Sequence, residues 1–194
     1  MAFPVTCRVD KIGHGAGRGQ DRVKPLFEAD EIREAVEQLG QRIARDYAGK
    51  PLTVLGVLTG SIILLADLVR AVDRPLTMGL IRASSYRGKT TRSDSLTISD
   101  DVLPELEGRD VLLVDDILDT GRTLEALLAR VRRENPASLR SAVLLWKQGR
   151  QEVKIEPDFY CFRVPDVFVV GYGLDYDGEY RQLPFIAALE DHDL

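Results

Sequence analysis

The chain has 194 residues, of which 44% are hydrophobic and 29% are charged, and its formal net charge is −5 with both histidines neutral. At this length a globular domain buries about 70% of the surface of the unfolded chain, so we expect one domain over residues 1–194. No hydrophobic run approaches the roughly 20 residues of a membrane span. Residues 1–10 also lack the pattern of a signal peptide. We therefore expect a cytoplasmic protein with no membrane partner.

Histidine and cysteine are too scarce for several kinds of catalysis. His14 and His192 lie far from the middle of the sequence, which argues against a Ser-His-Asp triad or a histidine-zinc site. Cys7 and Cys161 lack the Cys-x-x-Cys spacing of thiolate metal sites. Catalysis is therefore expected from carboxylates, lysine, arginine, hydroxyls and backbone amides, with any metal held by oxygen. The acidic balance also argues against a nucleic-acid partner, whose binding surface is usually basic.

Hydrophobic periodicity predicts strands that alternate with helices. A helix is expected over residues 30–47, with Gly49 at its end. Further helices are expected at 62–72 and 122–133, and strands at 52–58, 76–81, 111–114, 142–146 and 167–170. Helices of about a dozen residues between strands imply right-handed crossovers, so we expect an α/β fold with a mainly parallel twisted sheet flanked by helices. Ligands bind such sheets outside the carboxyl ends of the strands.

Two segments show no such periodicity. Residues 1–26 include four closely spaced glycines, but no strand precedes these glycines and no helix follows at once, so a flexible segment is expected rather than a phosphate loop. Residues 83–101 form the longest irregular stretch. From Arg82 to Ser93 the chain holds four basic residues and no acidic one. Two interpretations stay open, a solvated loop or a flap over an anionic substrate.

The sequence VLLVDDILDTGRTL, at residues 111–124, carries the clearest chemical signal. Asp115 and Asp116 follow a hydrophobic strand, where adjacent carboxylates repel each other and lose hydration, so they need a cation or hydroxyl donors. Residues 120–123 lead into a helix, whose first N–H groups favour an anion such as phosphate. A ribose 5-phosphate satisfies both ends at once. A capped turn with surface acids is the alternative, but carboxylates at a strand end serve no packing purpose. The expected phosphate-binding residues are Thr120, Gly121, Arg122 and Thr123.

This segment resembles the phosphoribosyl-pyrophosphate motif of the type I phosphoribosyltransferases, and the chain from about Phe27 to Leu189 resembles their hypoxanthine-guanine branch. The segments that carry the resemblance are VLTGS at 57–61, SSYRG at 84–88, VDDILDTGRT at 114–123, LLWK at 144–147 and PDVFVVGYGLDY at 165–176. The resemblance implies the type I phosphoribosyltransferase fold, with a small hood formed by the N- and C-terminal segments. It also implies a homodimer or homotetramer.

The resemblance assigns roles on the purine side of the site. Asp119 is expected to lie beside purine N7 as the general acid/base. Lys147 is expected to donate to the 6-oxo group, which selects hypoxanthine or guanine over adenine. Phe168 is expected to stack on the base, with backbone groups near Val169 and Asp175 at its remaining edge.

On the phosphate side, the resemblance implies Mg²⁺ as the cofactor. The expected Mg²⁺ ligands are Asp115, Asp116 and Asp175. The residues expected to hold pyrophosphate are Thr59, Gly60, Ser61 and Arg181. The expected flap residues are Ser85 and Tyr86. The implied reaction displaces pyrophosphate from phosphoribosyl pyrophosphate by a purine nitrogen, which gives IMP or GMP.

The chain departs from the family pattern at three positions. Asp115 stands where the family usually has glutamate, Thr59 where lysine or arginine is common, and Val167 where lysine is frequent. The first change affects how the ribose is held, and the second removes a positive charge near pyrophosphate. The resemblance also raises the possibility of a cis peptide bond between Leu58 and Thr59, which a sequence cannot show.

Two other functions compete with the purine enzyme. The VDDxLxTGRT pattern also resembles the phosphoribosyltransferase-fold attenuation regulator, which binds RNA and has uracil phosphoribosyltransferase activity. That family usually has tyrosine at the position of Asp119 and a basic surface, so Asp119, Lys147 and the acidic net charge favour the purine enzyme. A phosphorelay receiver domain also begins with a pattern like VLLVDD, but no later hydrophobic strand ends in an aspartate at the spacing such a domain needs.

Overall fold

The computed structural model describes residues 25–85, 96–99 and 103–189. Within these ranges the chain forms three helices and nine strands. In chain order they are β1 (Pro25–Phe27), α1 (Ala29–Asp46), β2 (Leu52–Leu58), α2 (Ile62–Ala71), β3 (Thr77–Ser85), β4 (Leu96–Ser99), β5 (Asp110–Leu118), α3 (Arg122–Arg132), β6 (Ser138–Lys147), β7 (Phe159–Val164), β8 (Phe168–Val170) and β9 (Ile186–Leu189). None of the helices in these ranges is long and apolar enough to cross a membrane.

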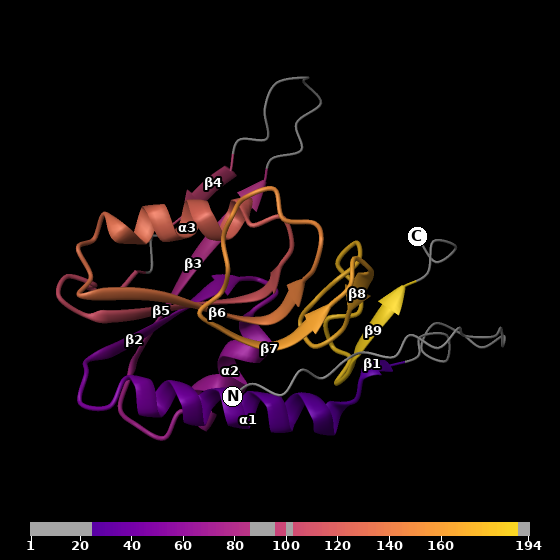
Figure 1. The fold of residues 1–194 in the computed structure, drawn as a ribbon, viewed down its shortest axis with the longest axis horizontal. Helices are drawn as coiled ribbons and strands as arrows, with labels where there is room; N and C mark the ends of the chain where they lie inside the picture. Colours follow the sequence, from indigo (N-terminus) through magenta and orange to yellow (C-terminus); the bar gives the residue numbers. More distant parts are fainter. Residues whose placement is uncertain (1–24, 86–95, 100–102, 190–194) are drawn as a thin grey trace, which may run out of the picture.

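A six-stranded sheet in the order β4-β3-β2-β5-β6-β7 forms the centre of the molecule. All its neighbouring strands are parallel except β3 and β4, which pair antiparallel. Helices α1 and α2 cover one face of the sheet and α3 covers the other (Figure 1). This arrangement confirms the predicted α/β fold with a mainly parallel sheet flanked by helices.

The middle strands are longer than their hydrophobic runs predict. Strand β5 continues to Leu118, and its parallel register with β6 holds from Asp110 opposite Ser138 to Leu118 opposite Trp146. Backbone hydrogen bonds make this ladder, so polar side chains do not end it. As a consequence, Asp115 and Asp116 lie within the strand instead of after it, and Asp119 is the first residue beyond its end.

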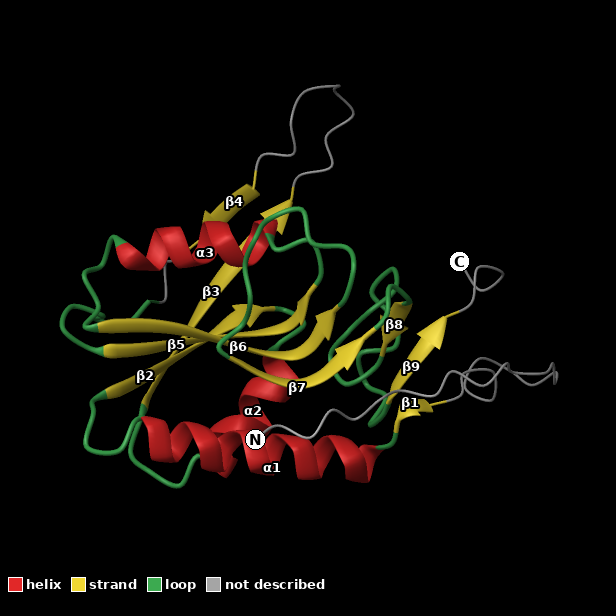
Figure 2. Cartoon of the chain, in the orientation of Figure 1, coloured by secondary structure: helices red, strands yellow, loops and turns green. Residues whose placement is uncertain are grey.

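The hood is a separate three-stranded sheet in the order β1-β9-β8 (Figure 2). It joins early and late segments of the chain, as predicted. One expectation about its strands was wrong. The strand expected at 167–170 belongs to this hood and not to the main sheet, whose edge position is taken by β7. The segment expected to be flexible, about 1–26, ends where β1 begins at Pro25, and β1 pairs with β9; residues 1–24 lie outside the described ranges.

Near its two ends, the irregular segment expected at 83–101 lies in the antiparallel strands β3 and β4. The register pairs Arg82 with Ser99 and Ser85 with Leu96, in an antiparallel ladder. The small polar residues at the end of β3 hide this strand from a hydrophobicity pattern. The expected flap residue Ser85 is the last residue of β3, whereas Tyr86 lies outside the described residues.

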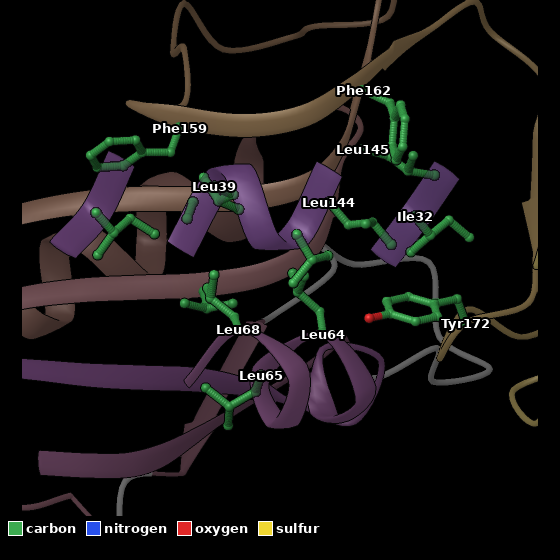
Figure 3. Close-up of a cluster of buried hydrophobic side chains, with 14 of the residues drawn as sticks. Ile32, Leu39, Leu64, Leu65, Leu68, Leu144, Leu145, Phe159, Phe162 and Tyr172 are labelled. Carbon is green, nitrogen blue, oxygen red and sulfur yellow. The ribbon is translucent and has the colours of Figure 1, made fainter. Parts of the chain in front are cut away.

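Two hydrophobic clusters hold the layers together. In the cluster between the sheet and helices α1 and α2, Ile32 and Leu39 of α1 pack with side chains of α2, β6 and β7 (Figure 3). The ring of Tyr172, from the segment after β8, joins this cluster, and its hydroxyl donates to Asp67 Oδ2 at 2.5 Å. The second cluster lies under α3 and contains Val111 and Leu113 of β5. Strand β5 is therefore buried on both faces, and the hood is fixed to the core by Tyr172.

Candidate active site

A pocket of about 330 Å³ opens at the carboxyl ends of β2 and β5, where the rule for parallel sheets places ligands. It is lined by Val57, Leu58, Thr59, Gly60, Ala83, Asp115, Asp116, Ile117, Leu118, Asp119, Thr120, Gly121, Thr123, Leu124, Asp175 and Arg181. Ten of these are predicted site residues, contributed by three separate parts of the chain. The sequence motifs therefore meet in one place.

Asp115, which is buried, and Asp116, which is half-buried, form a carboxylate pair on β5. The backbone N–H of Asp116 donates to Asp115 Oδ1 at 3.0 Å, and that of Ile117 donates to Asp116 Oδ1 at 2.7 Å. Burial and the neighbouring charge of Asp116 hold the pKa of Asp115 well above its usual range. Burial also raises the pKa of Asp116, although its hydrogen bonds and the charge of Arg181 oppose this. The pair therefore favours a ligand that supplies positive charge or hydroxyl donors.

Replacing Asp115 by asparagine is expected to stabilise the ligand-free protein at neutral pH. Because the pKa of Asp115 is raised by folding, this group costs stability above its unfolded-state pKa, and the cost grows as pH rises toward the folded-state pKa. Asparagine removes that cost and keeps the acceptor for Asp116 N–H. We expect the Tm at pH 7, measured in EDTA, to rise by about 3 °C or more. The difference should shrink as pH falls to about 4, and an unchanged or lower Tm at pH 7 contradicts the argument.

The loop between β5 and α3 forms the anion side of the pocket. Gly121 has a φ of 89°, in the left-handed region, and a Cβ at this position would lie 2.8 Å from Ile155 Cγ2, so glycine is required here. Thr120, Gly121 and Thr123 line the pocket at the N-terminus of α3. The side chain of Arg122 instead forms an ion pair with Glu152 outside the pocket lining. Three of the four predicted phosphate residues therefore meet in the pocket.

The loop between β2 and α2 forms the opposite side. The peptide bond between Leu58 and Thr59 is cis. Thr59 and Gly60 line the pocket, but the hydroxyl of Ser61 donates to Val57 O at 2.5 Å and its side chain is buried. Of the predicted pyrophosphate residues in this loop, Ser61 therefore offers no side-chain group to the pocket.

Arg181 enters the pocket from the segment between β8 and β9. Its guanidinium donates to Gly173 O at 2.6 Å and forms an ion pair with Asp175 at 2.7 Å. Asp175 also accepts a hydrogen bond from Gly178 N–H at 2.9 Å. Arg181 is the one guanidinium among the lining residues, and it faces a pocket that also holds the Asp115–Asp116 pair.

The carboxylates of this pocket suit a hard divalent cation. In the described part of the chain, no three acidic, histidine or cysteine side chains converge as a ready-made metal cluster. Mg²⁺, however, commonly uses only one or two protein carboxylates and completes its shell with water and substrate phosphates. Burial raises the pKa of both Asp115 and Asp116, so a further positive charge beside this pair is favourable. The donor set therefore fits Mg²⁺ bound together with a phosphate ligand.

A charged cluster borders the pocket beside Asp119. Lys147, at the end of β6, is buried except for 4% of its surface, and its Nζ lies 3.3 Å from Asp119 Oδ2. Arg150 Nε lies 3.5 Å from Asp119 Oδ1. Asp166 faces both cations, at 3.7 Å from Lys147 and 3.2 Å from Arg150. The sequence predicted Asp119 and Lys147 but missed Arg150 and Asp166, which lie in loops where no periodicity marks a site.

Phe168 and Val169 lie on β8, outside the pocket lining. The Phe168 ring is 39% exposed, which is unusual for a large aromatic side chain, and it packs edge-to-face against Tyr176 with 5.5 Å between centroids. Val169 is buried. An exposed ring leaves one face available for stacking, so Phe168 has the exposure its predicted role needs.

Comparisons with known proteins agree with this geometry. Residues 23–177 match the phosphoribosyl transferase domain. The hypoxanthine-guanine phosphoribosyltransferase of Streptococcus pneumoniae (strain ATCC BAA-255 / R6) is 44% identical over 171 residues, which cover 88% of this chain and 95% of that protein.

Solved structures give the same result. A hypoxanthine-guanine phosphoribosyltransferase from Bacillus anthracis superposes with a TM-score of 0.79 at 34% identity, covering 86% of this chain and 98% of that one. A hypoxanthine phosphoribosyltransferase from Staphylococcus aureus gives a TM-score of 0.81 at 36% identity, covering 87% and 92%.

The mainly parallel sheet, its hood and the pocket with an acid pair beside an anion loop define the type I phosphoribosyltransferase class. Because relatives above 30% identity cover most of its length, the chain belongs to the hypoxanthine-guanine phosphoribosyltransferase family.

Proposed function

We propose that the chain transfers the 5-phosphoribosyl group from phosphoribosyl pyrophosphate to hypoxanthine or guanine, with Mg²⁺ as cofactor, for purine salvage. The observation that carries this proposal is the pairing of Asp119 with buried Lys147 directly beside the anion loop. A carboxylate and an ammonium group at this place suit N7 and the 6-oxo group of a purine. The curated relatives are hypoxanthine-guanine phosphoribosyltransferases, so the RNA-binding regulator is not favoured.

In the proposed reaction, purine N9 forms a bond to C1 of the sugar while the bond from C1 to pyrophosphate breaks. The proton on N7 passes to Asp119. Asp115 and Asp116 stabilise the positive charge that develops on the sugar and accept hydrogen bonds from its hydroxyls. Thr120, Gly121 and Thr123 hold the 5′-phosphate.

Negative charge builds up on pyrophosphate as its bond to C1 of the sugar breaks. Arg181 and the backbone around Thr59 and Gly60 are proposed to hold it. Asp115 and Asp116 are proposed to hold one Mg²⁺, and Asp175 is proposed to lie near a second. When bound, Mg²⁺ neutralises charge on the phosphate oxygens and favours departure of pyrophosphate. To bind pyrophosphate, Arg181 has to give up part of its ion pair with Asp175 and contact the phosphate oxygens instead.

Lys147 is proposed to set the choice of base. Its Nζ is a donor only, so it favours the 6-oxo group of hypoxanthine or guanine over the 6-amino group of adenine. Phe168 supports the same proposal through its exposed ring, which suits stacking on a planar base.

Steady-state assays of the purified chain with Mg²⁺ and phosphoribosyl pyrophosphate test this function. We expect turnover of hypoxanthine and guanine to the monophosphates, no turnover of adenine or uracil, and loss of activity in EDTA that added Mg²⁺ restores. Turnover of uracil, or RNA binding without purine turnover, contradicts the proposal.

The proposal includes a homodimer or homotetramer, which rests on the family resemblance alone, and a cytoplasmic location, which rests on the lack of a membrane-length hydrophobic run and of a signal-peptide pattern. Light scattering coupled to size-exclusion chromatography measures the oligomeric state directly, and a monomer at assay concentration contradicts the proposed oligomer.

A further inference from the structure

One oxygen of Asp119 lacks the hydrogen bond that a buried carboxylate oxygen usually has. Oδ1 is buried and accepts no hydrogen bond, and its charged neighbour is Arg150, whose Nε lies 3.5 Å away. Oδ2 is paired with Lys147. The Asp119 carboxylate therefore lies between two cations, one on each oxygen, and only the lysine belongs to the predicted site.

Asp166 is a second carboxylate that lies close to both Lys147 and Arg150. Its Oδ1 lies 3.2 Å from Arg150 Nη1 and 3.7 Å from Lys147 Nζ. Together with Asp119 these residues make a group of two cations and two anions with no net charge. Because opposite charges alternate around the group, loss of one cation leaves the two carboxylates with a single partner.

The loop that carries Arg150 is fixed to the anion loop. The backbone N–H groups of Glu152 and Val153 donate to Thr120 O at 2.9 and 3.2 Å, and the side chain of Gln151 donates to Lys147 O. Thr120 directly follows Asp119. The segment after β6 is thus held against Thr120 and Lys147, which both lie beside Asp119. These contacts fix the position from which Arg150 approaches Asp119.

We propose that Arg150 is a positioning residue for the base-side chemistry, holding the Asp119 carboxylate in place through Oδ1 while Asp166 holds Arg150. This inference rests on the proposed function, since it concerns how the N7 partner is kept in position. An exposed ion pair usually contributes little to stability, and the Arg150 and Asp166 side chains are 52% and 53% exposed. The effect of Arg150 therefore falls on turnover and not on folding.

Replacing Arg150 by glutamine tests the inference. We expect kcat with hypoxanthine to fall about tenfold, a fraction of the 10²–10⁴-fold that a general acid/base contributes. The KM for phosphoribosyl pyrophosphate should stay within about twofold, and the Tm should be unchanged. Arg150→Lys should restore most of kcat relative to Arg150→Gln, because lysine returns the positive charge, although it lacks the planar guanidinium. Arg33→Gln, which removes an exposed ion pair to Asp30 on α1, is the matched control and should have wild-type kinetics.

A double-mutant cycle of Arg150 and Asp119 separates an effect of Arg150 that acts through Asp119 from any other effect. In an Asp119→Asn background Arg150 has lost its charged partner in the pocket and keeps only Asp166, so adding Arg150→Gln should lower kcat by less than about twofold. An equal tenfold loss in that background, or wild-type kcat for Arg150→Gln alone, overturns the inference. Failure of the wild-type chain to turn over hypoxanthine overturns the proposed function instead, so the two failures are distinguishable.

Discussion

Replacing Asp119 by asparagine is expected to lower kcat for hypoxanthine by about 10²-fold or more while leaving phosphoribosyl pyrophosphate binding largely intact. Asparagine has nearly the same shape and still offers an oxygen to Lys147, which lies 3.3 Å from Asp119 Oδ2. It cannot take the proton from purine N7. The loss therefore falls on a step after both substrates are bound.

Steady-state kinetics with hypoxanthine, together with calorimetric titration of phosphoribosyl pyrophosphate in Mg²⁺, separate these two effects. Asp30→Asn is the matched control, because Asp30 is an exposed aspartate on α1 whose ion-pair partner is Arg33. It should leave both measurements unchanged. A loss of phosphoribosyl pyrophosphate affinity as large as the loss of kcat would instead assign Asp119 to the ribose.

Replacing Gly60 by alanine is the second substitution with a large expected effect. A Cβ at this position would lie 1.6 Å from Asp116 Oδ2, which is too close for any contact. The backbone of Gly60 cannot move away freely, because Gly173 packs directly against it. A Cβ built at Gly173 would lie only 2.2 Å from the carbonyl oxygen of Gly60. The substitution must displace either the loop between β2 and α2 or the carboxylate of Asp116. Because displacements of about 1 Å can cost about 10²-fold in rate, we expect kcat/KM for phosphoribosyl pyrophosphate to fall by that order.

Gly49→Ala provides the control for this substitution. No atom lies within 4 Å of a Cβ at Gly49, and its φ of 74° makes alanine strained, at a cost of about 1–2 kcal/mol. It should therefore lower the Tm without changing the kinetics. Wild-type kinetics in Gly60→Ala would show that the pocket tolerates the displacement, contrary to this argument.

The sequence predicted the parallel sheet and the main motif because both depend on local patterns. Strand β2 matches its hydrophobic run of 52–58, and α3 begins at Arg122 as expected. The acid pair and the anion loop are adjacent along the chain, so their meeting in one pocket follows from one strand and one turn. The family resemblance brought in Lys147 and Arg181, whose places depend on other elements.

Contacts between distant loops were beyond such patterns. Arg150 and Asp166 follow different strands and meet only because β6 and β7 are neighbours, an arrangement that was not predicted because β7 was missed. Ser61 and Arg122 fit their motifs as residue types, but Ser61 uses its hydroxyl on Val57 O and Arg122 pairs with Glu152. A motif gives the position of a residue in the chain, whereas a rotamer depends on its neighbours in space.

The pairing of β1 with β9, with Pro25 opposite Ala187, also bears on the order in which the enzyme becomes active during synthesis. The acid pair lies on β5 of the main sheet and the anion loop directly follows it, so both leave the ribosome before the hood strands β8 and β9 do. Arg181 and β9 emerge last, and β1 must wait for β9 to find its partner. The acid pair and the anion loop are thus synthesised before Arg181, so the pocket gains this arginine only after those two parts have been made.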